Sequence, residues 1–203
     1  QLAVRIAPHI STRWADRLSS LDAVVQVIAA QYRTEPGNYL AFFSSFDYLQ
    51  QALDRLQQRH ADIPVWAQSR GMAEAEREAF LQRFTEHGAG IGFAVLGGAF
   101  GEGIDLPGRR LIGAFIATLG LPQVNPVNEQ MRARLQVRFG RGYDYAYLFP
   151  GLQKVVQAAG RVIRSEQDHG TVWLLDDRCA RAEVRRLLPA WWRVCVERPA
   201  QNP

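Results

Sequence analysis

Short apolar runs that alternate with helix-like segments constrain the fold of this chain more than any other feature. Continuous apolar runs of this kind are typical of strands buried on both faces of a sheet. They are expected at residues 39–43, from residue 65, at 91–96, at 110–119 and at 171–175. Because strands separated by helices form parallel sheets with helices on both faces, we predict an α/β domain with a mostly parallel sheet.

Helix-like patterns fill the intervals between these runs. They are expected at residues 21–33, 46 to about 60, 72–84, from Pro126, at 150–164 and at 178–188. This order divides the chain into a lead-in with a helix at 1–38, the α/β domain at 39–190, and a C-terminal tail at 191–203. The last residues of this tail, RPAQNP at 198–203, are expected to be loose. Open α/β sheets bind ligands at the carboxyl ends of their strands, so the segments that follow residues 43, 96 and 119 are the places to look for a site.

The composition narrows the class of protein. Hydrophobic residues make up 47% of the 203 residues, which is typical of a globular chain, and no apolar run approaches the roughly 18 residues of a membrane span. Two cysteines and four scattered histidines predict neither a disulfide framework nor a metal site. We expect a reducing cytoplasm and no membrane partner. The chain does not begin with Met, so we expect it to be part of a longer protein.

The net charge of +4 comes almost entirely from arginine. Arginine suits phosphate binding because its planar guanidinium offers a fork of donors. Compositional bias explains an excess of this size equally well. The charge therefore supports contact with nucleic acid without demonstrating it.

A basic stripe stands out in the segment QAAGRVIRSEQDHG, residues 157–170. On a helix running to residue 164, Gln157, Arg161 and Arg164 share one narrow stripe with Lys154 beside it, and the apolar residues occupy the opposite side. The stripe is either a solvated helix face or a site for an anion. No acidic residue within it neutralises the cations, which favours an anion site.

Two other segments could bind a ligand. GGAFGEGIDLPG, residues 97–108, places five glycines around Glu102 and Asp105, and glycines allow the backbone to turn sharply and approach a ligand closely. The hydroxyls of Ser44 and Ser45 could cap the following helix or bond phosphates. No GK[ST] phosphate-binding sequence occurs in the chain, so the usual nucleotide cradle is missing from it.

In this order, the segments resemble the second RecA-like motor domain of superfamily-two helicases, especially the DinG/XPD group. YLAFFSSFDYL is similar to motif IV of that group, and LGGAFGEGIDLPG resembles motif V. LGLPQVNP is similar to the segment that follows motif V, and QAAGRVIR resembles motif VI. DDR, residues 176–178, matches a D-x-R after the last strand. The resemblance covers residues 39–192 and implies a RecA-like three-layer fold.

The resemblance also implies roles for individual residues. Arg161 and Arg164 would be arginine fingers for ATP, and Gln157 would contact the same phosphate or the attacking water. Glu102, Gly103, Asp105 and Gly160 would couple the nucleotide cleft to the DNA groove. Ser44, Ser45, Gly97, Gly98 and Phe100 would contact single-stranded DNA. Ala99 and Gly101 depart from the pattern, since many relatives carry a hydroxyl and an aromatic residue there.

The implied function is that of the C-terminal motor domain of an ATP-dependent DNA helicase. It would move 5′-to-3′ on single-stranded DNA and unwind duplexes in repair or replication, in the bacterial cytoplasm with the nucleoid. ATP and Mg²⁺ would be bound mainly by an N-terminal motor domain of the same polypeptide, and any iron–sulfur cluster would lie outside this chain. The chain alone is not expected to hydrolyse ATP. The alternative is a non-catalytic α/β module that binds nucleic acid or protein.

Overall fold

A seven-stranded sheet forms the centre of the molecule, with every strand pairing parallel to its neighbours. The computed structural model describes residues 2–98, 100, 104–163 and 169–197. The strand order is β3-β4-β2-β5-β6-β1-β7. The strands are β1 (Leu2–Ile6), β2 (Asn38–Phe43), β3 (Val65–Ala67), β4 (Gly90–Val95), β5 (Gly113–Ala117), β6 (Gly170–Leu174) and β7 (Arg193–Val196). The predicted parallel α/β architecture is confirmed.

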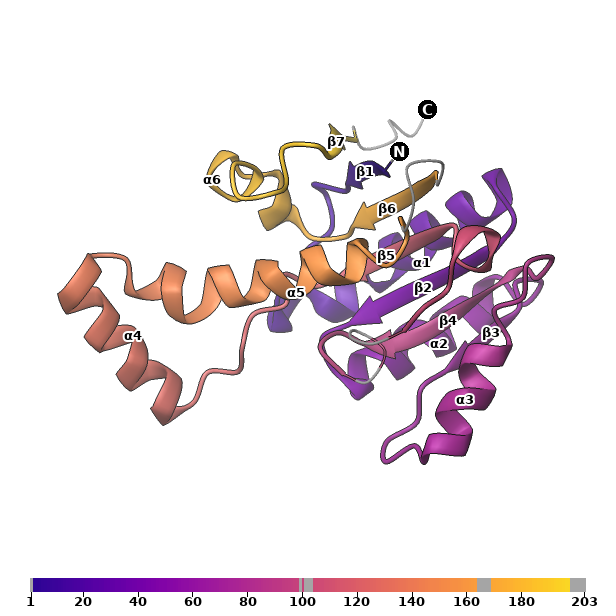
Figure 1. Cartoon of the computed structure of the whole chain (residues 1–203), viewed down its shortest axis with the longest axis horizontal. Helices are drawn as coiled ribbons and strands as arrows, with labels where there is room; N and C mark the ends of the chain where they lie inside the picture. The colour runs from indigo at the N-terminus through magenta and orange to yellow at the C-terminus, as the bar shows by residue number, and fades with distance from the viewer. Residues whose placement is uncertain (1, 99, 101–103, 164–168, 198–203) are drawn as a thin grey trace.

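Helices cover both faces of this sheet (Figure 1). α1 (Arg17–Thr34) and α2 (Phe46–Arg59) pack on one face, and α3 (Glu74–Gln82), α5 (Phe149–Ala159) and α6 (Ala182–Arg185) pack on the other. α4 (Pro126–Phe139) buries no residue and projects away from the sheet, joined to α5 by a π-helical segment at Asp144–Leu148. The domain therefore has three layers, with the sheet in the middle and helices on each side.

Strand β2 shows why these residues fold as they do. Tyr39, Ala41 and Phe43 contribute to the core beneath α1 and α2, whereas Leu40 and Phe42 contribute to the core beneath α3 and α5. All six residues of β2 are buried, because alternate side chains of a central strand point to opposite faces. An apolar strand without polar alternation therefore supplies both cores at once.

Two strands were not predicted from the sequence. β1 lies between β6 and β7, so part of the stretch assigned to the lead-in belongs to the sheet. β7 pairs with β1 through residues 193–196, a strand that was not predicted within the C-terminal tail. The residues predicted to be loose, 198–203, lie outside the described residues. Both strands depend on partners far away in sequence, and local patterns carry little information about such pairing.

Several helices end earlier than predicted. α5 ends at Ala159 rather than at residue 164, because Gly160 and the β-branched Val162 and Ile163 favour the helix less than the preceding residues do. The predicted helix at 178–188 is a 3₁₀ turn at Asp177–Ala180 followed by the single-turn α6. The predicted start of α4 at Pro126 is confirmed, with Asn125 as its N-cap.

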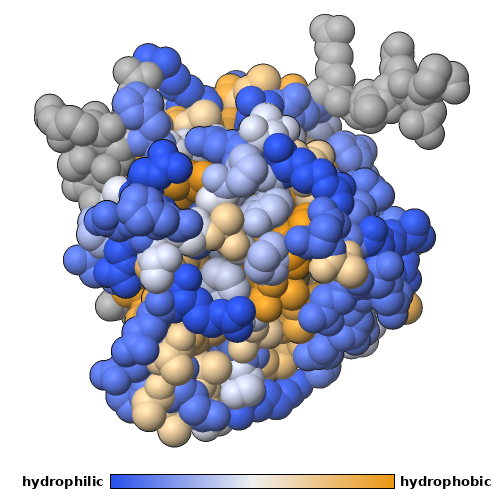
Figure 2. Space-filling view, turned by 90° about the vertical axis from the view of Figure 1, so that its right-hand side faces the viewer, coloured by the Kyte–Doolittle hydropathy of each residue, from blue (hydrophilic) through white to orange (hydrophobic). Residues whose placement is uncertain are grey.

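The end of the molecule at which the strands begin is shown in Figure 2. Hydrophilic side chains cover most of this end, and apolar ones are visible in patches between them. No helix in the part of the chain that the structure describes is long and apolar enough to cross a bilayer.

Candidate functional site

Helix α5 connects the two ends of the sheet. At its start, Gly151 packs against Leu119 and Gly120, just beyond the carboxyl end of β5. Past its end, Val162 packs against Gly170 at the beginning of β6. α5 therefore runs antiparallel to the strands. The residues at its end lie near the strand starts, not at the carboxyl edge where the sequence analysis looked for ligands.

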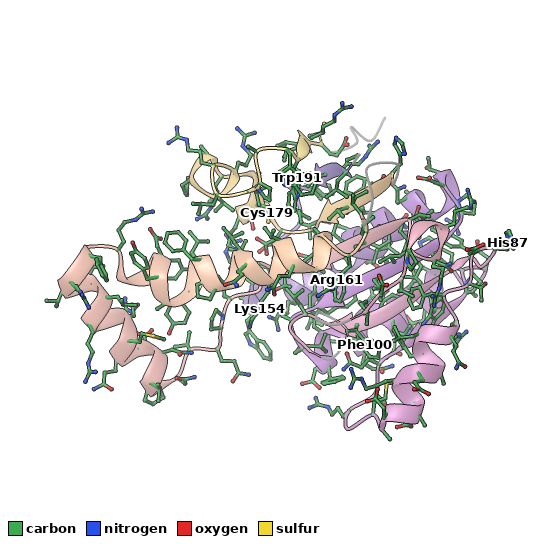
Figure 3. All side chains as sticks on the ribbon, viewed as in Figure 1. His87, Phe100, Lys154, Arg161, Cys179 and Trp191 are labelled. Carbon is green, nitrogen blue, oxygen red and sulfur yellow. The ribbon has the colours of Figure 1, made fainter. Side chains whose placement is uncertain are left out.

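Arg161 lies in a short turn after α5. Its backbone N–H donates to the carbonyl of Ala158 at 3.2 Å, and its Nη1 donates to the carbonyl of Ile104 at 3.4 Å. Figure 3 shows this side chain beyond Lys154 along the helix. The contact brings the predicted motif V and motif VI segments together. The Nε of Arg161 is buried and has no hydrogen-bond partner among the described residues, so an anion that reached it would satisfy this donor.

The predicted helical stripe does not form as expected. Because α5 ends at Ala159, Arg161 is positioned by the turn through Gly160 and not by helical periodicity. Gln157 is exposed and lines an open pocket with Gln153, Val156 and Leu187. The structure therefore places Gln157 on the solvent side of α5 and Arg161 against the motif V segment.

Three predicted residues, Arg164, Glu102 and Gly103, lie outside the described residues. Asp105 is exposed and follows Ile104, the residue that contacts Arg161. Gly160 has an ordinary helical φ of −64°, and a Cβ there would lie 3.3 Å from the carbonyl oxygen of Val156. The local backbone does not require glycine at position 160.

Gly97 and Gly98 lie at the carboxyl end of β4. Gly97 has a φ of +76°, and a Cβ at this position would lie 3.3 Å from Cδ of Lys154 in α5. Glycine is the residue that adopts this conformation without steric strain. The tight turn places the start of the glycine-rich loop directly against α5.

Phe100 occupies a different position from the one expected of a DNA contact. Its side chain is fully buried, and its ring centroid lies 4.2 Å from that of Phe80 in α3. The side chain therefore anchors the glycine-rich loop to the core, and only the backbone at this position remains available for the predicted contact.

Ser44 and Ser45 follow β2 and differ in their bonding. The hydroxyl of Ser45 accepts a hydrogen bond from the backbone N–H of Tyr48 at 3.2 Å and caps α2, which confirms the capping interpretation for one of the pair. The Oγ of Ser44 is buried and has no partner among the described residues. Of the two hydroxyls, that of Ser44 is therefore the one not used as a helix cap, and a phosphate would reach it only through movement of the atoms that cover it.

The sequence analysis missed a polar network at the carboxyl end of β6. The buried carboxylate of Asp176 accepts from Nε of Arg178 at 2.8 Å, from its Nη2 at 2.7 Å, and from the hydroxyl of Thr12. Burial raises the pKa of Asp176, but the hydrogen bonds and charge of Arg178 outweigh it and hold that pKa below its ordinary value. The network ties the segment after β1 to the segment after β6. The resemblance supplied the D-x-R match but not the partner Thr12.

No cluster of three or more potential metal ligands occurs among the residues with described positions. The arrangement instead offers two surfaces. One, at the carboxyl ends of the strands, presents Ser44, Gly97 and Gly98. The other, past the end of α5, presents Arg161 beside the loop at residues 104–105. Both present hydrogen-bond donors, which suit phosphate oxygens.

Residues 28–195 match the family model for a helicase C-terminal domain. The chain is 30% identical over 193 residues to the ATP-dependent DNA helicase chl-1 of Caenorhabditis elegans, covering 89% of this chain and 22% of that protein. It is 26% identical over 209 residues to the general transcription and DNA repair factor IIH helicase subunit XPD of Dictyostelium discoideum, covering 92% of this chain and 27% of that protein.

The solved structure of XPD in its apo form gives a TM-score of 0.77 at 18% identity, covering 97% of this chain and 40% of that one. This likeness confirms the predicted RecA-like fold. The chain spans about a quarter of the length of the two curated relatives described above.

Proposed function

The chain belongs to the family of helicase C-terminal domains, in the DinG/XPD-like group of superfamily-two helicases, and on this premise we propose that it is the second motor domain of an ATP-dependent DNA helicase. ATP and Mg²⁺ would be bound mainly by a first motor domain of the same polypeptide. The observation that carries the proposal is the contact of Arg161 with the carbonyl of Ile104, which joins the motif VI and motif V segments at one surface.

Arg161 fits the role of an arginine finger. Its turn is held by backbone hydrogen bonds to the end of α5, and its buried Nε has no partner among the described residues. A guanidinium already positioned in this way needs little reorganisation to meet the negative charge that develops on a transferred phosphoryl group. ATP bound between this domain and the first motor domain would supply that phosphoryl group. Gln157, exposed on the same helix, would contact the γ-phosphate or the attacking water.

The carboxyl edge of the sheet fits the path of a single DNA strand. Ser44 provides an unpaired hydroxyl, and the turn at Gly97 and Gly98 exposes backbone close to α5. Backbone and hydroxyl donors contact phosphates without reading the sequence of bases, as a translocating motor requires. Translocation in the 5′-to-3′ direction, and a role in DNA repair or replication, are parts of the same proposal.

The test uses a polypeptide that also carries the first motor domain. Arg161→Ala should lower the kcat of DNA-stimulated ATP hydrolysis by about 10³-fold or more, because the arginine acts mainly on the transition state. Arg109→Ala is the matched control: Arg109 is an exposed arginine just before β5, and its loss should leave kcat within a few-fold of wild type.

Two results would contradict the proposal. ATP hydrolysis by Arg161→Ala within a few-fold of wild type would remove the finger role from this residue. The 203-residue chain contains no GK[ST] phosphate cradle, so it should not hydrolyse ATP by itself. DNA-stimulated ATP hydrolysis by this chain alone would contradict the assignment of it as one half of a motor. A full-length protein that lacks a first motor domain would favour the alternative function, a non-catalytic binding module.

A further inference from the structure

A groove runs along the carboxyl ends of β1, β2 and β5. Part of its lining belongs to the segments that resemble the family, and the part around residues 12–18 lies outside them. Its lining includes Ser44, Thr118, Leu121 and Arg178, and it continues into a smaller apolar pocket formed with Leu18, Tyr48 and Gln51. Four residues line both parts: Trp14, Arg17, Ser45 and Asp47. The groove therefore joins the unpaired hydroxyl of Ser44 to a surface built around Trp14.

Trp14 is unusually exposed for its size. The residue is 81% exposed, although tryptophans in folded proteins are mostly covered. Its ring is nevertheless held in place, because the guanidinium carbon of Arg17 lies 5.3 Å from the ring centroid. One face of the indole is thus supported by the protein, and the large exposed fraction leaves ring surface available to a partner.

Arg17 is itself fixed from three directions. Its guanidinium carbon also lies 5.1 Å from the ring centroid of Tyr48, and its Nε donates to the carbonyl of Thr12 at 3.1 Å. The cation is therefore held between two aromatic rings and anchored to backbone. A cation–π contact at an exposed ring contributes about 0.5–1 kcal/mol, so the contact with Arg17 favours the position of the Trp14 ring beside the groove.

The charges around the groove leave one cation without a carboxylate partner. Arg13 pairs with Asp177 and Arg178 pairs with Asp176. Asp47 bonds Arg70 and is 74% exposed, and Asp16 accepts from Ser11. In the described part of the chain, no carboxylate pairs with Arg17, and burial lowers the pKa of its guanidinium. A nearby anion would offset the cost of burying this charge.

We propose that Trp14, backed by Arg17, is a base-stacking platform for single-stranded nucleic acid that lies across the carboxyl edge of the sheet. Successive bases stack on exposed aromatic rings in sequence-independent single-strand binding, while cations and hydroxyls hold the backbone. Here the ring is Trp14, the cation is Arg17 and the hydroxyl is that of Ser44. The inference rests on the proposed function, and it extends the strand path from Gly97 and Gly98 past Ser44 to the segment after β1.

The experiment measures binding of a fluorescent oligothymidylate to the 203-residue chain by anisotropy at fixed, moderate salt. Trp14→Ala should weaken binding by about 5- to 150-fold, the effect of losing one stacked base. Trp14→Phe should recover most of that loss, since phenylalanine retains an aromatic face. Trp191→Ala is the matched control, because Trp191 is also exposed, at 62%, but does not line the groove.

A second oligonucleotide of the same length with abasic sugars isolates stacking from charge. Wild type and Trp14→Ala should bind it equally, because no base remains to stack. Equal affinity of both proteins for oligothymidylate would overturn the platform, as would an equal loss on the abasic strand. These results leave the kinetics of Arg161→Ala untouched, so the two proposals fail separately. No detectable binding by wild type would overturn the platform together with the DNA contact on which it rests.

Discussion

The Asp176–Arg178 pair should be the most sensitive electrostatic feature of this fold. The Asp176 side chain is 0% exposed and that of Arg178 is 16% exposed, so Asp176→Asn leaves a mostly buried cation without its counter-charge. Removing one partner of a buried pair typically costs about 3–5 kcal/mol. Asparagine keeps one acceptor oxygen for Arg178 or Thr12, so we expect a loss near the lower limit, about 3 kcal/mol in the free energy of unfolding.

Urea unfolding followed by circular dichroism measures this loss, and Asp177→Asn is its control. Asp177 pairs with Arg13 at 2.6 Å, but the two side chains are 29% and 36% exposed, and exposed pairs contribute only about 0–1 kcal/mol. The double variant Asp176→Leu/Arg178→Met should recover much of the loss, because it removes both buried charges. Asp176→Asn within about 0.5 kcal/mol of wild type, the usual range for surface changes, would refute this account.

The same pair sets the direction of a pH dependence. Because the folded-state pKa of Asp176 lies below its ordinary value, its contribution to stability is complete above about pH 4, near the unfolded pKa of aspartate. The contribution is lost as the pH falls through the folded-state pKa. The stability difference between wild type and Asp176→Asn should therefore shrink below about pH 4.

Two further predictions concern the candidate DNA contacts. Phe100→Ala should lower the free energy of unfolding by about 3–5 kcal/mol, because the ring is buried against Phe80. Phe100→Leu should lower it by less than about 1.5 kcal/mol. Weaker DNA binding by Phe100→Ala without a drop in melting temperature would argue against this packing role. Ser45→Ala should lower the free energy of unfolding by about 1 kcal/mol, because the α2 cap is lost. Ser44→Ala should leave that free energy nearly unchanged, because the Ser44 hydroxyl has no partner among the described residues. Equal losses for the two variants in urea unfolding would contradict the assignment of the cap.

Local sequence predicted the elements whose signals are contained in a few neighbouring residues. Pro126 predicted the start of α4, and the serine pair at 44–45 predicted the start of α2, because caps and first-turn residues act within one helical turn. The apolar runs at 39–43, 91–96, 110–119 and 171–175 predicted the central strands β2, β4, β5 and β6, because burial on both faces removes polar alternation. β1 carries Arg5 among its apolar residues and is positioned by pairing with β6 and β7, which lie more than a hundred residues away.

The candidate site shows the same division. Gln157, Gly160 and Arg161 were predicted because they lie within one short motif, and their roles stay predictions. The contact of Arg161 with Ile104 joins two segments that lie far apart in the sequence. The burial of Phe100 depends on Phe80, which a different helix supplies. The placement of Arg17 between Trp14 and Tyr48 depends on α2, which supplies Tyr48. Neither property is present in any short stretch of the sequence, because each is set by tertiary packing.

The parallel topology supplies a physical route between the two proposed surfaces. β4 and β5 run in the same direction, so the connection between them must return from the carboxyl edge to the strand starts. Gly97 and Gly98, near the start of this connection, belong to the proposed DNA surface, and Ile104 at its middle contacts Arg161. α5 spans the same two ends and meets this connection again where Gly97 lies against Lys154. Movement of a strand against Gly97 would therefore act on the same loop and helix that position Arg161. Coupling of this kind requires a shared element with two arrangements. Among the described residues, Gly97, Ile104 and helix α5 touch the two surfaces.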